Sequence, residues 1–353
     1  MNTGVVGGVC MAHAPQFLTL PETEDKATVE RVRELARENG RRLAALEPDV
    51  YIVIANDHAN QFLLHCIPPF TLHRGAEARG SFAGHDFKYQ VSSEISTRLI
   101  RHLQAEGFDP AFSSDAEIDY AFGIPLDFLG IAGPIIPLWV NAYVPPQPSV
   151  ERCYAFGQAM ERGLTALGVR AAVVTSGGLS HFPGTERYAE PDTDFDRALM
   201  AEMETGNLRW LLSLDEKRLD DTGNVEVRCW AVTAGMLGQR KPDMTSFDPS
   251  WHHNYATLAW YSEPEKAEES RHYPAVAPEH VGLMRALHVL AHDGDARARY
   301  LDDPEAYAGG LDIDPEERKA LASLDQDAML ALGIHPFLPF MARLWLDRQR
   351  EQE

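Results

Sequence analysis

Four uninterrupted apolar runs constrain the fold of this chain more than any other feature of its sequence. Each run passes from small and branched apolar residues into a polar residue: VVGGVCMAH (5–13), VYIVIANDH (50–58), PIIPLWVNAY (134–143) and AAVVTSGGLSH (171–181). Runs that are apolar on both faces are typical of strands buried in a largely parallel sheet. Helical patterns lie between them, over 22–47, 92–107 and 150–168. The sequence therefore predicts an α/β domain with a mostly parallel central sheet flanked by helices, opening with a βαβ unit.

Three of the four runs end on a histidine, and the other passes Asn141 before a proline turn. The histidines are His13, His58 and His181. Ligands of open α/β sheets collect at the carboxyl ends of the strands, so we expect these three side chains to meet at one edge of the sheet. Six further histidines are interpreted as lacking this strand-end placement and as surface or packing residues: His65, His73, His85, His102, His288 and His292.

A carboxylate joins this set from the segment GNVEVRCWAVTAGML (223–237). We expect Asn224 to cap a helix and Glu226 to lie in its first turn. Two histidines and one carboxylate with open positions form the facial triad of mononuclear non-haem Fe(II) oxygenases. The strand-end pattern alone does not say which two of the three histidines would be ligands.

Several segments resemble the motifs of one known family, in order and at similar spacing. They are NDHANQF (56–62), IPLWVNAYVPPQPSVERCYAFG (136–157), TSGGLSHFPG (175–184) and GNVEVRCW (223–230). All are similar to motifs of the class III extradiol ring-cleavage dioxygenases of the protocatechuate and gallate type. The resemblance covers most of residues 5–261. It implies that O2 opens the ring of a substituted catechol beside the diol, at a mononuclear Fe(II), to give a muconic semialdehyde-type product.

The resemblance also implies roles for single residues. His13, His58 and Glu226 would be the metal ligands, and His181, in GGLSH, would be the acid/base histidine. A neutral imidazole near pH 7 can serve both as a base and, once protonated, as an acid. Ser180, in the same motif, is predicted to contact the substrate.

Two positions depart from the family pattern. In IDYAFGIPL, Tyr120 occupies the position of the second active-site histidine; we predict that its phenol donates a hydrogen bond to the substrate or to oxygen, with a packing aromatic as the alternative. In WHHNYATLAWY, His253 aligns with a serine and Asn254 with an asparagine of a segment that contacts the substrate. We predict substrate contacts for both, with strand-edge packing as the alternative.

A second resemblance lies at the C-terminus. Residues 299–338 are similar to the small helical subunit that accompanies the catalytic chain in protocatechuate enzymes and is fused to it in gallate-type relatives. Within this stretch, GIHPFL makes Phe337 a candidate lid over the substrate pocket and His335 a weaker polar contact. We predict a catalytic domain over 1–265, a charged linker at 262–274 and a small all-α domain over 275–353. Because so small a helical domain would be marginally stable alone, it should pack on the catalytic domain or on a second protomer, and we expect a homodimer.

Charge and composition narrow the classes of partner. The chain has 353 residues, and 53 acidic against 32 basic side chains give a net charge of −21, which argues against nucleic acid or an anionic membrane as a partner. No apolar run approaches the ~20 residues that span a bilayer, and we expect a cytoplasmic enzyme. The four cysteines are scattered without a CxxC pair and are expected to be reduced packing residues: Cys10, Cys66, Cys153 and Cys229.

Three other functions stay open at this point. The first is a ring-cleaving dioxygenase that acts on an aminophenol instead of a protocatechuate-like or gallate-like acid. The second is a zinc-dependent hydrolase, since a His/His/Glu set also suits zinc with an activated water; such an enzyme would work without oxygen. The third is a non-catalytic binding protein on the same scaffold, against which the intact ligand set counts.

Overall fold

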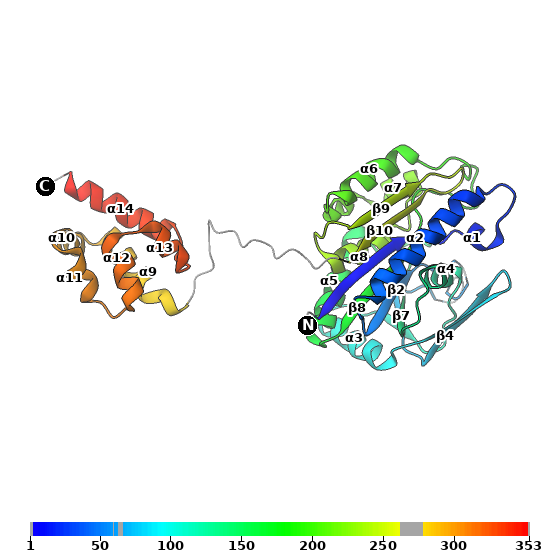
Figure 1. Cartoon of the computed structure of the whole chain (residues 1–353), viewed down its shortest axis with the longest axis horizontal. Coiled ribbons are helices and arrows are strands. Elements are labelled where there is room, and N and C mark those ends of the chain that lie inside the picture. Colours follow the sequence, from blue (N-terminus) through cyan, green and yellow to red (C-terminus); the bar gives the residue numbers. More distant parts are fainter. Residues whose placement is uncertain (1–2, 59, 63–65, 262–277, 352–353) are drawn as a thin grey trace. The chain divides into compact units, whose positions relative to one another are not determined.

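A computed structural model describes residues 3–58, 60–62, 66–261 and 278–351. The chain divides into two compact units, Met1–Pro264 and Glu265–Glu353 (Figure 1). The predicted linker at 262–274, with the domain bounds at 265 and 275, lies outside the described residues. No helix in the described part of the chain is long and apolar enough to cross a membrane.

The first unit is built on an eight-stranded sheet whose central strands are the four apolar runs. In spatial order the strands are β6 (Ala111–Ser113), β3 (Phe70–His73), β7 (Ile135–Val140), β2 (Val50–Ala55), β8 (Arg170–Ser176), β1 (Gly4–Met11), β10 (Tyr255–Trp260) and β9 (Met244–Asp248). The β7–β2–β8–β1 core is parallel, as are β3 and β6, whereas β3 runs antiparallel to β7 and the β1–β10–β9 pairs are antiparallel. The predicted α/β fold with a mostly parallel sheet is confirmed. Strand β8 lies between β1 and β2, so the strands of the opening βαβ unit are not direct neighbours.

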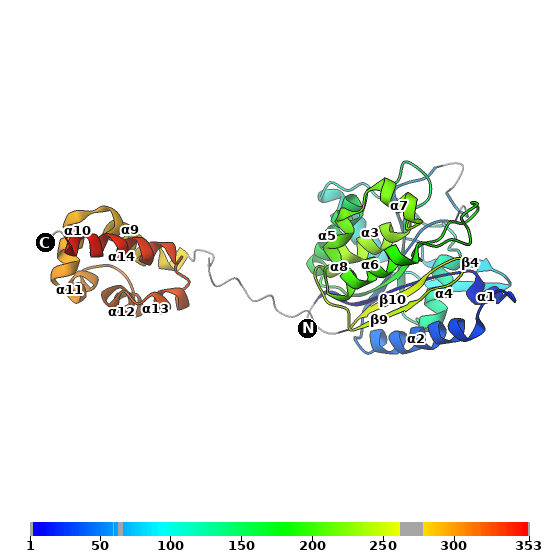
Figure 2. The ribbon, with the colours of Figure 1, turned by 90° about the horizontal axis from the view of Figure 1, so that it is seen from above.

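Helices cover both faces of this sheet. Figure 2 shows α2 (Lys26–Ala44) on one side and α5 (Val150–Ala166), α6 (Thr193–Glu204) and α8 (Val227–Leu237) on the other. The same division appears in two separate apolar cores, because alternate residues of each strand point to opposite faces. The remaining elements of this unit are α1 (Gln16–Thr19), α3 (Ser93–Ala105), α4 (Tyr120–Leu129), a 3₁₀ turn η1 (Leu208–Ser213), α7 (Glu216–Thr222) and a separate hairpin of β4 (Glu77–Phe82) and β5 (His85–Gln90).

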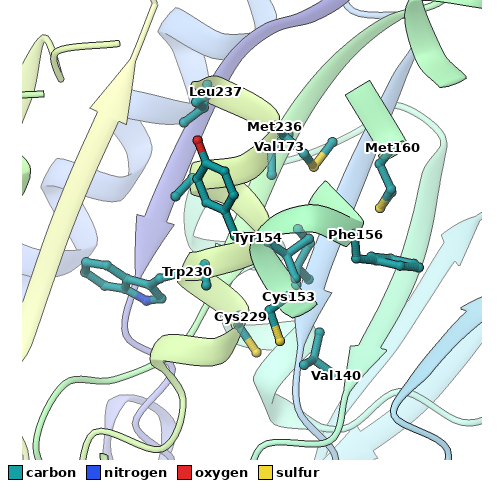
Figure 3. Close-up of a cluster of buried hydrophobic side chains, with 14 of the residues drawn as sticks. Val140, Cys153, Tyr154, Phe156, Met160, Val173, Cys229, Trp230, Met236 and Leu237 are labelled. Carbon is teal, nitrogen blue, oxygen red and sulfur yellow. The ribbon is translucent and has the colours of Figure 1, made fainter. Parts of the chain in front are cut away.

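Helices α5 and α8 are in direct backbone contact. A Cβ added to Gly157 would lie 1.9 Å from the Val232 carbonyl oxygen, and one added to Gly235 would lie 2.0 Å from that of Tyr154, so only glycine fits at either position. Figure 3 shows side chains of the two helices close together, among them Cys229 of α8 beside Cys153 of α5. This close packing holds the N-terminal end of α8, where Glu226 is, at a defined height over the sheet.

The second unit consists of helices around a core of its own. They are the 3₁₀ turn η2 (Pro278–His280), α9 (Val281–His292), α10 (Gly294–Asp302), α11 (Pro304–Gly309), α12 (Pro315–Ser323), α13 (Gln326–Ala331) and α14 (Phe337–Arg350). Aspartates cap four of these helices, at positions 293, 303, 314 and 325, and each accepts hydrogen bonds from the first-turn amides. The predicted helical C-terminal region is confirmed.

Candidate active site

The strand-end histidines do meet at one edge of the sheet. His13 follows β1, His58 follows β2 and His181 follows β8, and because these three strands are parallel neighbours their carboxyl ends lie together. Glu226 approaches from the N-terminal end of α8 and is fully buried. The side chains of Ser176, at the end of β8, and of Tyr143, after β7, reach the same place.

Three ligand-capable atoms converge to similar separations. His13 Nε2 lies 3.2 Å from His58 Nε2 and 3.4 Å from Glu226 Oε1, and His58 Nε2 lies 3.5 Å from that oxygen. Three atoms about 2.1 Å from one ion, with angles of about 100–110° between them, would lie about 3.2–3.4 Å apart, so the set has the size of a first-row metal site. His13, His58 and Glu226 form one of two groups in the described residues that could hold a metal ion. The second such group, in the helical unit, is His280, Asp314 and Glu317, of which Asp314 and Glu317 form the capping box of α12.

The far side of each converging residue is held by a hydrogen bond. His58 Nδ1 lies 3.0 Å from Asp119 Oδ2, and since a carboxylate only accepts, Nδ1 carries a hydrogen; in the neutral ring, the form that a metal would bind, the lone pair is on Nε2. His13 Nδ1 lies 2.8 Å from Ser176 Oγ, and Glu226 Oε2 accepts from the Gly178 amide at 2.5 Å. Such partners orient metal ligands in proteins. Asn56 Nδ2 also lies 3.1 Å from His58 Nε2.

Burial and neighbouring charges set the ionisation of the cluster. Burial raises the pKa of Glu226, but the adjacent histidines, His13 first, outweigh it and hold that pKa well below its usual range. Burial lowers the pKa of His58, yet the carboxylates of Asp119 and Glu226 together outweigh this and raise it to about 9. Burial lowers the pKa of His181, which is therefore neutral near pH 7 and able to accept a proton.

The tautomer of His181 is also defined. Its Nδ1 lies 2.7 Å from the Leu179 carbonyl oxygen, so Nδ1 carries the hydrogen and the lone pair is on Nε2. That Nε2 lies 3.8 Å from Glu226 Oε1, close to the converging set but outside its triangle of 3.2–3.5 Å. The arrangement therefore places a neutral base beside a site that could bind a metal.

Comparison with known proteins decides the family. Residues 7–259 match the family described as the catalytic LigB subunit of aromatic ring-opening dioxygenase. This chain belongs to the LigB family. That family is one of extradiol ring-cleaving dioxygenases, so the sequence-based assignment to extradiol dioxygenases is confirmed at this level.

Several curated relatives of this chain carry one recurring name. The chain is 33% identical over 195 residues to 2,3-dihydroxyphenylpropionate/2,3-dihydroxicinnamic acid 1,2-dioxygenase of Klebsiella pneumoniae (strain 342), covering 54% of this chain and 61% of that protein. It is 27% identical over 311 residues to the protein of the same name from Cupriavidus necator, covering 72% and 97%. The chain thus spans 61% of the length of the first of these relatives. Among solved structures, it resembles an uncharacterized Escherichia coli K12 protein with a TM-score of 0.48 and 14% identity, covering 72% of this chain and 99% of that chain.

Tyr120, the first departure of this LigB chain, lies directly against the converging set. It is the first residue of α4, and its ring stacks on that of His58 with the centroids 4.6 Å apart and lies 5.8 Å from that of His13. Burial, with the charges of Asp119 and Glu226, raises the pKa of Tyr120, so the phenol keeps its hydrogen. The position suits both the predicted hydrogen bond and the packing alternative.

His253, the second departure, is buried against His181, the predicted base. Its ring stacks on that of His181, with centroids 4.2 Å apart and an interplanar angle of 11°. Its Nε2 has no hydrogen-bond partner and fills the space where Gly178 would carry a Cβ. Burial lowers the pKa of His253 well below its usual range, so the ring is neutral. Its predicted substrate contact stays a prediction.

Ser180 and Asn254 are engaged within the protein. The Ser180 hydroxyl donates to the Thr222 carbonyl oxygen and accepts from the Asp192 amide, and the Asn254 amide donates to Asp196 at 2.7 Å. Asp196 is fully buried and also accepts from the Ser180 amide at 3.0 Å and from Asn224 at 2.9 Å. Burial raises the pKa of Asp196 to about 6. The geometry favours a supporting role, in which one carboxylate ties together the segments that carry His181, Glu226 and His253.

Sequence reasoning was wrong about Asn224 and missed three residues. Glu226 itself stands at the N-cap position of α8 without a side-chain cap, and Asn224 binds Asp196 instead of capping. The missed residues are Ser176, Asp119 and Tyr143. Strand-end position was a usable signal for Ser176 and Tyr143. Asp119 is the N-cap of α4, a role that its position before that helix could have indicated.

The residues predicted as a lid lie in the helical unit. Phe337 begins α14 and is 56% exposed, and its backbone amide donates to His335 Nδ1 at 3.2 Å. Their predicted roles in substrate binding stay predictions. All four cysteines are free, and Cys10, Cys153 and Cys229 are buried as predicted for packing residues; Cys66 is exposed, so the packing prediction is wrong for that residue.

Proposed function

We propose that this chain is an Fe(II)-dependent extradiol dioxygenase that uses O2 to open the ring of a substituted catechol beside its diol, giving a muconic semialdehyde-type product. The observation that carries the proposal is the convergence of His13, His58 and Glu226. Their ligand atoms lie 3.2–3.5 Å apart, and each residue is held from behind by a hydrogen bond. Family membership supplies the reaction class.

Iron fits this donor set. Two imidazoles and one carboxylate, with room for further ligands, are the donors of Fe(II) oxygenases. When bound, Fe(II) would bring the diol and O2 together and remove the spin barrier to their reaction, while the electrons that reduce O2 would come from the diol. The protein's own contribution is to hold the ligands, exclude water and move a proton.

His181 is the residue that we assign to proton transfer. It is neutral, its Nε2 lone pair faces the ligand set, and its Nδ1 is fixed by the Leu179 carbonyl. It would take a proton from the diol and return it when the ring opens. Tyr120, stacked on His58, would donate a hydrogen bond to the substrate or to oxygen.

The substrate is proposed to be an aromatic diol with a polar side group. We predict a protocatechuate-like or gallate-like acid; the relatives are named for a dihydroxyphenylpropionate, which is also a carboxylated catechol. Arg228, the cation nearest to Glu226 in sequence, donates to the Pro148, Ala142 and Val225 carbonyl oxygens. Because these hydrogen bonds already engage the Arg228 guanidinium, we propose that a neutral group such as His253 recognises the carboxylate.

Loading with iron under anaerobic conditions tests the proposal. Fe(II) is added to the purified chain without air, and aerated buffer is then mixed with protocatechuate, gallate, 2,3-dihydroxyphenylpropionate or 2-aminophenol. A yellow ring-opened product formed with stoichiometric O2 uptake is expected for at least one diol. Zinc-loaded protein is the matched control and should consume no O2. Turnover of an ester or amide by the zinc form without oxygen, with no ring opening by the iron form, would favour the hydrolase instead.

Homodimer formation stays a prediction that light scattering would check.

A further inference from the structure

One phenol joins the predicted base to the predicted ligand carboxylate. The hydroxyl of Tyr143 lies 2.7 Å from His181 Nε2 and 3.0 Å from Glu226 Oε1. Its ring lies 5.8 Å from that of His58, centroid to centroid. The side chain is partly buried, and a phenol, which ordinarily titrates near pH 10, keeps its hydroxyl hydrogen near pH 7.

The turn after β7 fixes the place of this hydroxyl. The Asn141 side chain donates to the Val144 carbonyl at 2.7 Å and accepts from the Val144 amide at 3.0 Å, which clamps the backbone on both sides of Tyr143. The Ala142 carbonyl accepts from the buried Arg228 guanidinium at 3.4 Å. Side chains that bracket a turn in this way restrict its conformations. These hydrogen bonds therefore restrict the position of the Tyr143 hydroxyl in the site.

The contact has one hydroxyl hydrogen for two acceptors. His181 Nδ1 donates to a carbonyl, so in the neutral ring Nε2 can only accept. The carboxylate of Glu226 can also only accept. The single hydrogen of the Tyr143 hydroxyl thus faces two acceptors, at 2.7 and 3.0 Å, and can satisfy one of them well at a time.

We propose that Tyr143 is a positioning residue for proton transfer, whose hydroxyl hydrogen serves His181 and Glu226 in turn; the inference rests on the proposed function of the site. When a diol hydroxyl approaches, the Tyr143 hydrogen turns to Glu226 and the His181 lone pair becomes free. The O–H bond of the diol then breaks and an Nε2–H bond forms, while the electron pair stays on the substrate oxygen. The new Nε2–H donates to the Tyr143 oxygen, which still donates to Glu226.

This arrangement stabilises both protonation states of the base. Tyr143 can donate to the neutral ring and accept from the imidazolium without moving more than its hydrogen. A purely structural tyrosine would give no reason for such coupling to His181.

Steady-state kinetics of Tyr143→Phe in the iron-loaded full chain test the proposal. We expect kcat to fall about 3-fold to 100-fold, the range for losing one hydrogen bond to a neutral or charged partner, with KM and iron content nearly unchanged. Tyr154→Phe, which removes a phenol from the core shown in Figure 3, is the matched control and should leave kcat unchanged. In a His181→Ala background, Tyr143→Phe should add less than about 2-fold, because its effect acts through that ring. Undiminished kcat in Tyr143→Phe, or a full additional loss in the His181→Ala background, would overturn the proposal.

A measurement on the metal-free protein gives a readout that does not depend on turnover. With ¹⁵N-labelled histidine, the His181 signals should show hydrogen on Nδ1 and an Nε2 that accepts a hydrogen bond. In Tyr143→Phe the Nε2 signal should move toward that of a nitrogen that accepts none, and in Tyr154→Phe it should stay in place. An unmoved signal in Tyr143→Phe overturns the inference alone. If iron-loaded wild type opens no ring with any diol, the proposed function and this inference fall together.

Discussion

Replacing Gly178 with alanine is the sharpest test of how the site is packed. A Cβ at this position would lie 1.5 Å from His253 Nε2 and 2.4 Å from its Cε1, which is a direct overlap with a buried ring. His253 cannot move freely, since it is 4% exposed and stacked on His181. The Gly178 amide also holds Glu226, so a shift of the loop would loosen a predicted ligand.

The expected cost follows from overpacking in a rigid interior. Forcing an extra methyl group into such a place costs about 1–3 kcal/mol of unfolding free energy. For a unit of this size each kcal/mol lowers the melting temperature by about 2–4 °C, so we expect a fall of roughly 2–12 °C for the catalytic unit. Gly177→Ala is the matched control in the same loop, because its Cβ would meet Trp230 Nε1 at 3.2 Å, a contact that a small shift relieves.

A double-mutant cycle with His253→Ser identifies the cause. Removing the ring empties the space that the new methyl group would fill, so Gly178→Ala should cost little in the His253→Ser background, whatever His253→Ser costs by itself. Urea unfolding of the four proteins measures the coupling. An equal cost of Gly178→Ala in both backgrounds would show that His253 does not occupy this space and would refute the packing described here.

Four further outcomes are expected. Glu226→Ala should no longer bind Fe(II) tightly, as measured by metal analysis, and normal iron content in this variant would refute the ligand set. His181→Ala should keep its metal, and its catalytic rate should fall by a factor on the order of 10² to 10⁴. Because the pKa of His58 is raised to about 9 and a metal requires the neutral ring, Zn(II) affinity by equilibrium dialysis should rise up to about tenfold per pH unit from pH 6 to 8; affinity independent of pH would contradict this. Tyr120→Phe should lower the rate or affinity about 3-fold to 100-fold on the best substrate, and wild-type kinetics would leave Tyr120 as packing only. The pKa of Asp196 is raised to about 6, so its contribution to stability is fully present below about pH 4 and is lost as pH rises through 6. Urea unfolding from pH 4 to 7 should show this dependence in wild type and not in Asp196→Asn. The Asp196→Asn variant should also be less stable by about 1–3 kcal/mol, because its new amide group faces three hydrogen-bond donors.

The strands and their ends could be predicted from the sequence for a simple reason. A strand that is apolar on both faces can only be central in a covered sheet, and parallel neighbours place their carboxyl ends together whatever their order. The meeting of His13, His58 and His181 therefore did not require the correct strand order, and the insertion of β8 between β1 and β2 left the prediction intact.

The partners of these residues could not be predicted in the same way. Asp119 lies 61 positions from His58, and Tyr143 lies 83 positions from Glu226. Which side chain of a loop turns toward a neighbouring strand end depends on local turns, such as the Asn141 clamp, that a pattern of apolar residues does not encode. The prediction for Asn224 failed for a different reason. The residue has the right type and position for a helix cap, but its side chain donates a hydrogen bond to the buried carboxylate of Asp196 instead.

The two departures from the family pattern share one physical feature in the structure. Tyr120 stacks on His58 at 4.6 Å and His253 stacks on His181 at 4.2 Å, so each places a ring against a histidine of the site. A substitution that restores the family residue, Tyr120→His or His253→Ser, changes this packing together with hydrogen bonding. Phenylalanine at position 120 keeps the ring and removes only the hydroxyl, whereas at position 253 it would put a larger ring into a closely packed place. Substrate preference that changes in Tyr120→His but not in Tyr120→Phe would therefore be assigned to the new imidazole, whereas preference that changes in both would be assigned to the lost phenol.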